Sequence, residues 1–221
     1  MNFVSLRETL TRIQESLAKR DAVRQDVQTA VRKVTRQAKQ AIFQVHSGKL
    51  EEAENTLNEA YNLLASLSDL AKESPDLLYS GTVDSAFEEY AEAQIFLHLA
   101  KEKRFVGFEE IEVPMIPYVL GLADVIGELR RRALDSMRKN ENKKAVHMLE
   151  LMETIYVELT NLDEIQFLVP GLRRKCDVAR RVIEATRGDV TVDVRRSQLE
   201  NSIRELKRTL EARRKHGSSF S

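Results

Sequence analysis

The stretch VSLRETLTRIQESLAKRDAVRQDVQTAVRKVTRQAKQAIFQV, residues Val4–Val45, contains neither glycine nor proline. Apolar side chains recur in it every three or four residues, which is the period of one face of an α-helix. These side chains are Leu6, Leu10, Ile13, Leu17, Val23, Val27, Ala30, Val34, Ala38, Ile42 and Val45. The pattern predicts one very long amphipathic helix, which ends at Gly48.

The rest of the chain repeats this pattern, and proline and glycine divide it into further helices. We expect a second helix through Leu57 to Leu70, closed by Glu73-Ser74-Pro75 because the residue before a proline resists helical geometry. The other predicted helices span 84–105, 118–137 with Pro117 in the first turn, 142–162, 172–186 and 194–214. Residues 190–194 could pass for a strand, but one short strand makes no sheet. The predicted fold class is all-α, with about seven helices.

Length and composition indicate one globular domain. The chain has 221 residues, of which 42% are hydrophobic and 32% charged, and eight Gly and four Pro leave room for few breaks. We expect a single domain over residues 1–216 and a flexible tail over 217–221. No apolar run is long enough to span a membrane, and no secretory signal follows the start. A single cysteine, Cys176, forms no internal disulfide, so a cytoplasmic protein without a membrane partner is expected.

Charge is segregated along the chain although the formal net charge is zero. Residues 1–40 have nine Lys and Arg against four Asp and Glu, and residues 171–221 have fourteen against seven. Residues 41–170 have twelve against twenty-four. Basic ends and an acidic middle suit a protein that attracts phosphates with one surface and holds a metal with another. Ordinary pairing between solvated helix faces explains the same pattern equally well.

Four carboxylates on two predicted helices are the candidate catalytic and metal-binding residues: Glu89, Glu92, Asp124 and Glu128. Residues three or four apart lie on one face of a helix, so each pair makes a two-pronged acidic site. Glycines beside the second pair, Gly121 and Gly127, predict close approach by another backbone or a ligand, because glycine inside a helix is otherwise unfavourable. The alternative is that Asp124 and Glu128 are solvent-exposed and pair with Arg131 and Arg132.

Carboxylate oxygens are hard ligands, which suit Mg²⁺ or Mn²⁺ better than zinc. Such an ion can polarise a phosphodiester and lower the pKa of a bound water, while a carboxylate accepts the proton. No glycine-rich phosphate loop or Ser-His-Asp pattern competes with this chemistry. The sequence therefore favours metal-dependent phosphodiester hydrolysis.

Basic residues on the first and sixth predicted helices are the candidate nucleic-acid contacts. With few aromatic residues and no tryptophan, binding to a phosphate backbone should be electrostatic and tolerant of sequence. Many of these side chains could instead cover apolar helix flanks with their stems. The candidates are Arg20, Arg24, Arg32, Lys33, Arg36, Lys39, Arg173, Arg174 and Lys175.

Four segments together resemble the translin family, and in particular its branch of translin-associated factor X. They are TRQAKQAIFQVH (35–46), EYAEA (89–93), PYVLGLADVIGELR (117–130) and LRRKCDVAR (172–180). The likeness covers residues 27–188, and the third segment is its most specific part. The predicted helix over 194–214 extends beyond the usual end of the family.

This resemblance implies an antiparallel helical bundle that forms a closed octamer and encloses RNA or DNA. In the factor X branch, acids of the EYxEA and ADxxGEL motifs line a Mg²⁺-dependent endoribonuclease site, so the resemblance assigns these roles to Glu89, Glu92, Asp124 and Glu128. It also implies a homo-oligomer, expected to be an octamer, with RNA and possibly single-stranded DNA as partners.

Two alternatives remain open from the sequence. In the first, the protein binds single-stranded RNA or DNA without cutting it, and its acids pair with Arg131 or Arg132. In the second, the protein is a helical scaffold for a protein partner and binds no nucleic acid.

Overall fold

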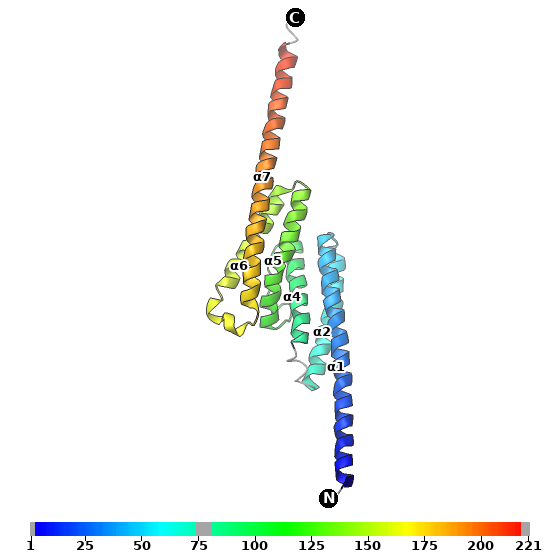
Figure 1. The fold of residues 1–221 in the computed structure, drawn as a ribbon. Helices are drawn as coiled ribbons and strands as arrows, with labels where there is room; N and C mark the ends of the chain where they lie inside the picture. Colours follow the sequence, from blue (N-terminus) through cyan, green and yellow to red (C-terminus); the bar gives the residue numbers. More distant parts are fainter. Residues whose placement is uncertain (1–2, 74–80, 218–221) are drawn as a thin grey trace. The chain divides into compact units, whose positions relative to one another are not determined.

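The computed structural model describes residues 3–73 and 81–217, whose helices are shown in Figure 1. Within these ranges the chain is all-α, as predicted, with six α-helices, one 3-10 helix and no strand. The helices are α1 (Phe3–His46), α2 (Leu50–Glu73), α4 (Thr82–Lys101), α5 (Met115–Arg138), α6 (Asn142–Thr160), η1 (Asp163–Leu168) and α7 (Leu172–Gly217).

The helices belong to two compact units. The first comprises residues 1–125 with 167–172, and the second comprises 126–166 with 173–221. Helix α5 runs without a break across the division between residues 125 and 126. The prediction of one domain over residues 1–216 therefore stays a prediction.

In the first unit, helices α1, α2 and α4 pack on one another. The apolar stripe of α1 is buried from Val27 onward, while the earlier residues Leu6 to Leu17 in that stripe are exposed. The core is built from side chains that are at most 2% exposed: Val34, Ala38, Leu57, Leu64, Ile95 and Phe96. Burial of this size is the main stabilising contribution to such a unit.

The second unit has its own core. Residues Leu129, Met152, Ile155 and Leu159, from α5 and α6, are at most 2% exposed. Ile183 and Val190 of α7 are each 4% exposed and recur at helical spacing. The single cysteine, Cys176, is also buried in this helix, and burial raises the pKa of its thiol.

Helix ends follow the local sequence signals. Gly48 has φ +77°, the left-handed conformation that glycine adopts without strain, two residues after α1 ends. Asn140 takes φ 58°, a left-handed conformation, two residues after α5 ends at Arg138, which agrees with its predicted role as a helix stop. The third predicted helix was expected to reach Phe105 but ends at Lys101, where the N–H of Glu102 donates to the carbonyl of His98.

The largest error of the sequence prediction concerns the last two helices. They were expected over 172–186 and 194–214, with Arg187-Gly188 as a break, and residues 190–194 were weighed as a strand. The structure has one continuous helix, α7, over Leu172–Gly217. Gly188 stays helical because ion pairs hold its neighbours on either side: Arg187 binds Glu153, and Asp189 binds Arg130.

Two predictions fall partly or wholly outside the described residues. Ser74 and Pro75 follow the last described residue of α2, Glu73. Of the expected tail, only Gly217 is described, and it is the last residue of α7. Among the described helices, none has a stretch that is both long and apolar enough to cross a lipid bilayer.

Candidate metal centre and nucleic-acid interface

Helix α4 presents Glu89 and Glu92 from a mostly buried segment. Its residues Tyr90, Ala91 and 93–97 are buried, whereas Glu89 and Glu92 are half-buried. A helix with this much buried surface has to be enclosed by neighbours. The acids therefore lie at the edge of a packed region, where water screens charge less than it does on an open surface.

Helix α5 approaches this part of α4 at Gly121. A Cβ atom added to Gly121 would lie 2.6 Å from the carbonyl oxygen of Glu88 and 2.9 Å from the backbone nitrogen of Glu92. Real Cβ atoms do not come so close to backbone, so only glycine allows this contact. The predicted close approach is confirmed for Gly121. No such approach is seen at Gly127, where no other part of the described chain lies within 4 Å of an added Cβ.

The contact at Gly121 brings Asp124 to the same end of the helix pair. Asp124 follows Gly121 by three residues and therefore lies one turn further along that face of α5. All three acids Glu89, Glu92 and Asp124 belong to the first compact unit, and Asp124 is half-buried. The two sequence segments that supply the acids thus meet at backbone distance.

Glu128 comes one helical turn after Asp124 but belongs to the second unit. Its carboxylate lies 3.9 Å from Arg131, and 23% of its side chain is exposed. This is the ion pair that the alternative interpretation of the acids predicts. The other expected partner, Arg132, is half-buried, and burial lowers the pKa of its guanidinium.

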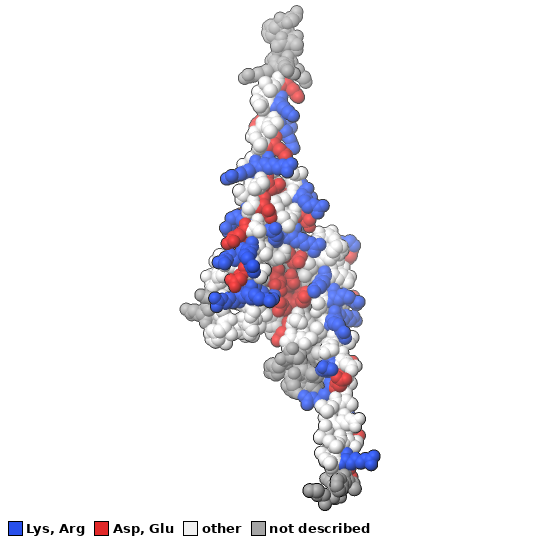
Figure 2. All heavy atoms as spheres, viewed as in Figure 1, with Lys and Arg blue, Asp and Glu red and all other residues white. Residues whose placement is uncertain are grey.

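Glu89 is paired with a cation from α1. Nζ of Lys39 lies 3.2 Å from a carboxylate oxygen of Glu89. Figure 2 shows acidic side chains gathered over α4, beside basic side chains of α1. The sequence predicts Lys39 only as a nucleic-acid contact, because no spacing rule connects residues fifty positions apart.

The chemical type of these ligands suits a hard divalent cation, but the present positions of their side chains do not. Three carboxylates at the edge of a packed region are the ligands that Mg²⁺ and Mn²⁺ prefer. However, no three His, Cys, Asp or Glu side chains in the described parts of the chain are close enough together to hold one ion. The Lys39 ammonium beside Glu89 shows that one of these carboxylates already pairs with a positive charge, and the chemistry of the donor set, although not its present geometry, fits a hard divalent ion.

The predicted basic residues of α1 form a stripe on the surface. Arg32, Arg36 and Lys39 lie on one face at helical spacing and are exposed, and Lys33 is an exposed neighbour. Lys39 ends this stripe beside Glu89 of α4. Earlier on the helix, Arg24 binds Asp21 at 3.0 Å, and Arg20 is exposed.

The basic residues of α7 lie in the second unit. Arg173 and Arg174 are exposed, and Lys175 is half-buried. They occupy the first turn of the helix, where the backbone already carries partial positive charge.

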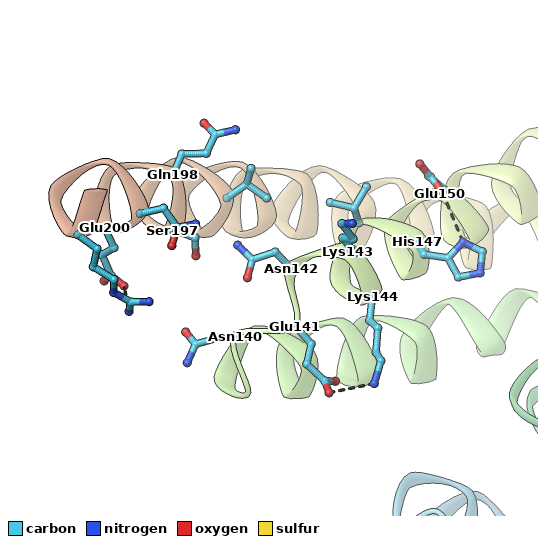
Figure 3. A pocket seen from close by; sticks show the side chains of 14 residues that line it. Asn140, Glu141, Asn142, Lys143, Lys144, His147, Glu150, Ser197, Gln198 and Glu200 are labelled. Atoms are coloured by element: carbon cyan, nitrogen blue, oxygen red, sulfur yellow. Dashed lines mark hydrogen bonds and ion pairs between the residues drawn. The ribbon is translucent and has the colours of Figure 1, made fainter. Parts of the chain in front are cut away.

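The second unit also contains a groove that the sequence did not predict. It has a volume of about 930 Å³ and lies between the start of α6 and residues 194–204 of α7 (Figure 3). Two of its basic side chains lie beside carboxylates: Lys144 binds Glu141 at 2.9 Å, and His147 lies 3.5 Å from Glu150. None of the predicted site residues lines it.

Comparison with known proteins places the chain in a family. The model of the Translin family matches residues 22–185, which is about three quarters of the chain. The chain belongs to the Translin family. The resemblance stated from the sequence is thereby confirmed at the level of the family.

Three relatives of this Translin-family chain illustrate the match. The structure of AfC3PO in complex with duplex RNA is 33% identical, with a TM-score of 0.74, and the alignment covers 84% of this chain and 96% of that one. Apo-NeC3PO has the same TM-score, 0.74, at 22% identity over 83% of this chain and 96% of that one, and supports the fold alone. An uncharacterised protein of Methanocaldococcus jannaschii is 30% identical over 192 residues, covering 86% of this chain and 85% of the relative.

Proposed function

We propose that this protein is a Mg²⁺-dependent endoribonuclease of the translin-associated factor X type, which binds RNA within a homo-oligomeric shell. A cytoplasmic location and an octameric assembly are parts of the same proposal. The observation that carries it is the backbone contact at Gly121, because it joins the two acidic segments, 88–92 and 121–124, at one place.

Glu89, Glu92 and Asp124 would hold the ion, with Mn²⁺ as an alternative to Mg²⁺. Bound there, the ion would polarise the scissile phosphodiester and lower the pKa of a water molecule. Glu128, one turn beyond Asp124, would serve as a further ligand or accept the proton of the attacking water. Lys39 would have to leave Glu89, which an exposed lysine with four rotatable bonds does readily.

The basic stripe of α1 would hold the RNA backbone. Arg32, Arg36 and Lys39 lead along one helix face to Glu89, so a phosphate chain bound to them would pass the acids. Support for RNA as the ligand comes from AfC3PO, whose complex contains duplex RNA and which shares 33% identity over 84% of this chain. Arg20 and Arg24, together with Arg173, Arg174 and Lys175, would add contacts in the same electrostatic, sequence-tolerant manner.

The test is cleavage of labelled single-stranded and duplex RNA with Mg²⁺ and with a chelator. Asp124→Asn should reduce the cleavage rate by roughly a hundredfold or more while leaving RNA binding in place. Asp135→Asn is the matched control, because Asp135 lies on the same helix and pairs with Arg138 at 3.5 Å. Cleavage by Asp124→Asn at the rate of the unsubstituted protein would refute the assignment.

A second candidate function is RNA or DNA binding without cleavage. It is favoured by the ion pairs of Lys39 with Glu89 and of Arg131 with Glu128, which neutralise two of the four acids without a metal. This function predicts binding that weakens with salt and no cleavage under any metal condition. It also predicts that Asp124→Asn leaves every nucleic-acid readout unchanged.

A further inference from the structure

The end of helix α7 carries an exposed apolar stripe beyond the part of the chain that matches the family. The match ends at residue 185, whereas α7 continues to Gly217. Five large apolar side chains in this extension are between 45% and 68% exposed: Val192, Leu199, Ile203, Leu206 and Leu210. Large apolar side chains that share one exposed stripe indicate an interaction surface.

The stripe faces away from the groove of its own unit. The groove is lined on α7 by Val194, Ser197 and Asn201, among others, and Figure 3 shows Ser197 beside it. At 100° per residue, Leu199 and Ile203 point to the side of α7 opposite to Ser197. Contacts within the unit therefore leave the stripe open, and from Asn201 to Glu211 every described residue is exposed.

The spacing within the stripe is that of a coiled coil. Steps of four, three and four residues separate Leu199, Ile203, Leu206 and Leu210, which places leucine at the d positions 199 and 206, isoleucine at the a position 203 and leucine at the a position 210. Val192 is the preceding d position, and Arg196 is the polar a position between them. Isoleucine at a with leucine at d favours two parallel strands.

Charges beside the stripe favour a second copy of the same helix. In a parallel pair each g position meets the e position five residues later on the other strand, so Arg195 of one copy meets Glu200 of the other. The next such pair joins Ser202 and Lys207, which do not repel. Glu200 lies 3.2 Å from Arg196 on its own helix, which draws that guanidinium out of the seam.

A second exposed apolar stripe in the described part of the chain is a poorer partner. It comprises Leu6, Leu10, Ile13 and Leu17 of α1 and has the same spacing. Aligned in parallel with α7, it would set Arg7 against Arg195, and aligned antiparallel it would set Arg7 against Lys207. Either arrangement opposes like charges.

We propose that residues 192–210 of α7 form a parallel two-stranded coiled coil with the same segment of a second copy of this chain. Each pair of copies is thereby joined outside the family-matched part, residues 22–185. The pairing does not depend on the nuclease proposal.

The test is disulfide cross-linking of the full-length chain in a Cys176→Ser background, which removes the other thiol. Leu210→Cys should give a covalent dimer on mild oxidation, because only a parallel, in-register pair brings the two copies of position 210 together. Gln198→Cys is the matched control, since Gln198 is exposed on the groove side of α7. Failure of Leu210→Cys to cross-link, or equal cross-linking by both variants, would overturn the proposal.

A charge exchange tests the partner contact. Arg195→Glu should lower the yield of the Leu210→Cys dimer by roughly tenfold, because it opposes two carboxylates on each flank of the seam. Adding Glu200→Arg to the same chain should restore the yield, since it re-forms the opposite charges across the seam. A double variant that stays as weak as the single one would contradict the pairing of Arg195 with Glu200.

Discussion

The backbone of Gly121 on α5 lies so close to that of Glu88 on α4 that a single added Cβ would come within 2.6 Å of the Glu88 carbonyl oxygen. Two helices that meet main chain to main chain cannot accept even a methyl group between them without separating.

Gly121→Ala should therefore destabilise the protein. Alanine is the better helix former by about 1 kcal/mol, but overpacking against a rigid backbone outweighs this gain and should leave a net loss of about 1 to 3 kcal/mol. Thermal and urea unfolding measure the difference. Gly127→Ala is the control, because an added Cβ there meets nothing within 4 Å, and it should stabilise by about 0.5 to 1 kcal/mol. Equal effects of the two substitutions would contradict the close approach.

Lys39→Met should change the free energy of unfolding little but should increase the affinity for a metal ion. The Lys39 side chain is 64% exposed, and an ion pair this accessible contributes at most about 1 kcal/mol. Under the proposed function, removing the ammonium from Glu89 should tighten Mn²⁺ binding several-fold, because the cation no longer competes with it. Isothermal titration with Mn²⁺ measures this, and Lys33→Met, an exposed neighbour on α1, should leave the affinity unchanged.

Raising the pH above 10 should lower the free energy of unfolding because of the buried Tyr90. Burial raises the pKa of Tyr90 from 10.0 to about 12, and its hydroxyl accepts a hydrogen bond from Nε2 of Gln94 at 2.7 Å. Between these pH values the unfolded chain releases a proton that the folded chain retains, so stability falls as pH rises, by about 2 to 3 kcal/mol in total. Urea unfolding at pH 9 to 12 should show a shallower decline for Tyr90→Phe than for Tyr156→Phe, which keeps Tyr90.

Much of the fold was predictable because apolar periodicity and the helix-ending effects of glycine and proline act over only a few residues. The long first helix and its end near Gly48 follow from a stripe of apolar residues and one left-handed glycine, and the structure has both. The same local rule failed at Arg187-Gly188, where glycine was expected to break the chain. There, Arg187 binds Glu153 at 2.7 Å, and Arg130 binds Asp189 at 3.2 Å, so contacts before and after Gly188 hold the helix together.

The candidate site was predictable only in part for a similar reason. Spacing along a helix places Glu89 near Glu92 and Asp124 near Glu128, and the helical glycine at 121 indicated the backbone contact. No local signal places Lys39 on Glu89, because that pair depends on how α1 packs against α4. The sequence also does not show which way the acidic side chains point. In the described residues, no three of them are close enough together to hold one ion.

The main-chain contact at Gly121 positions the helix pair, whereas the acidic side chains would supply the proposed chemistry. Since backbone atoms set the close approach of α5 to α4 at Gly121, a descendant of this chain that exchanged the acids for neutral residues would keep this contact between the same two helices. Loss of hydrolysis would then leave an intact binding protein, and a substitution at the glycine would remove both properties together.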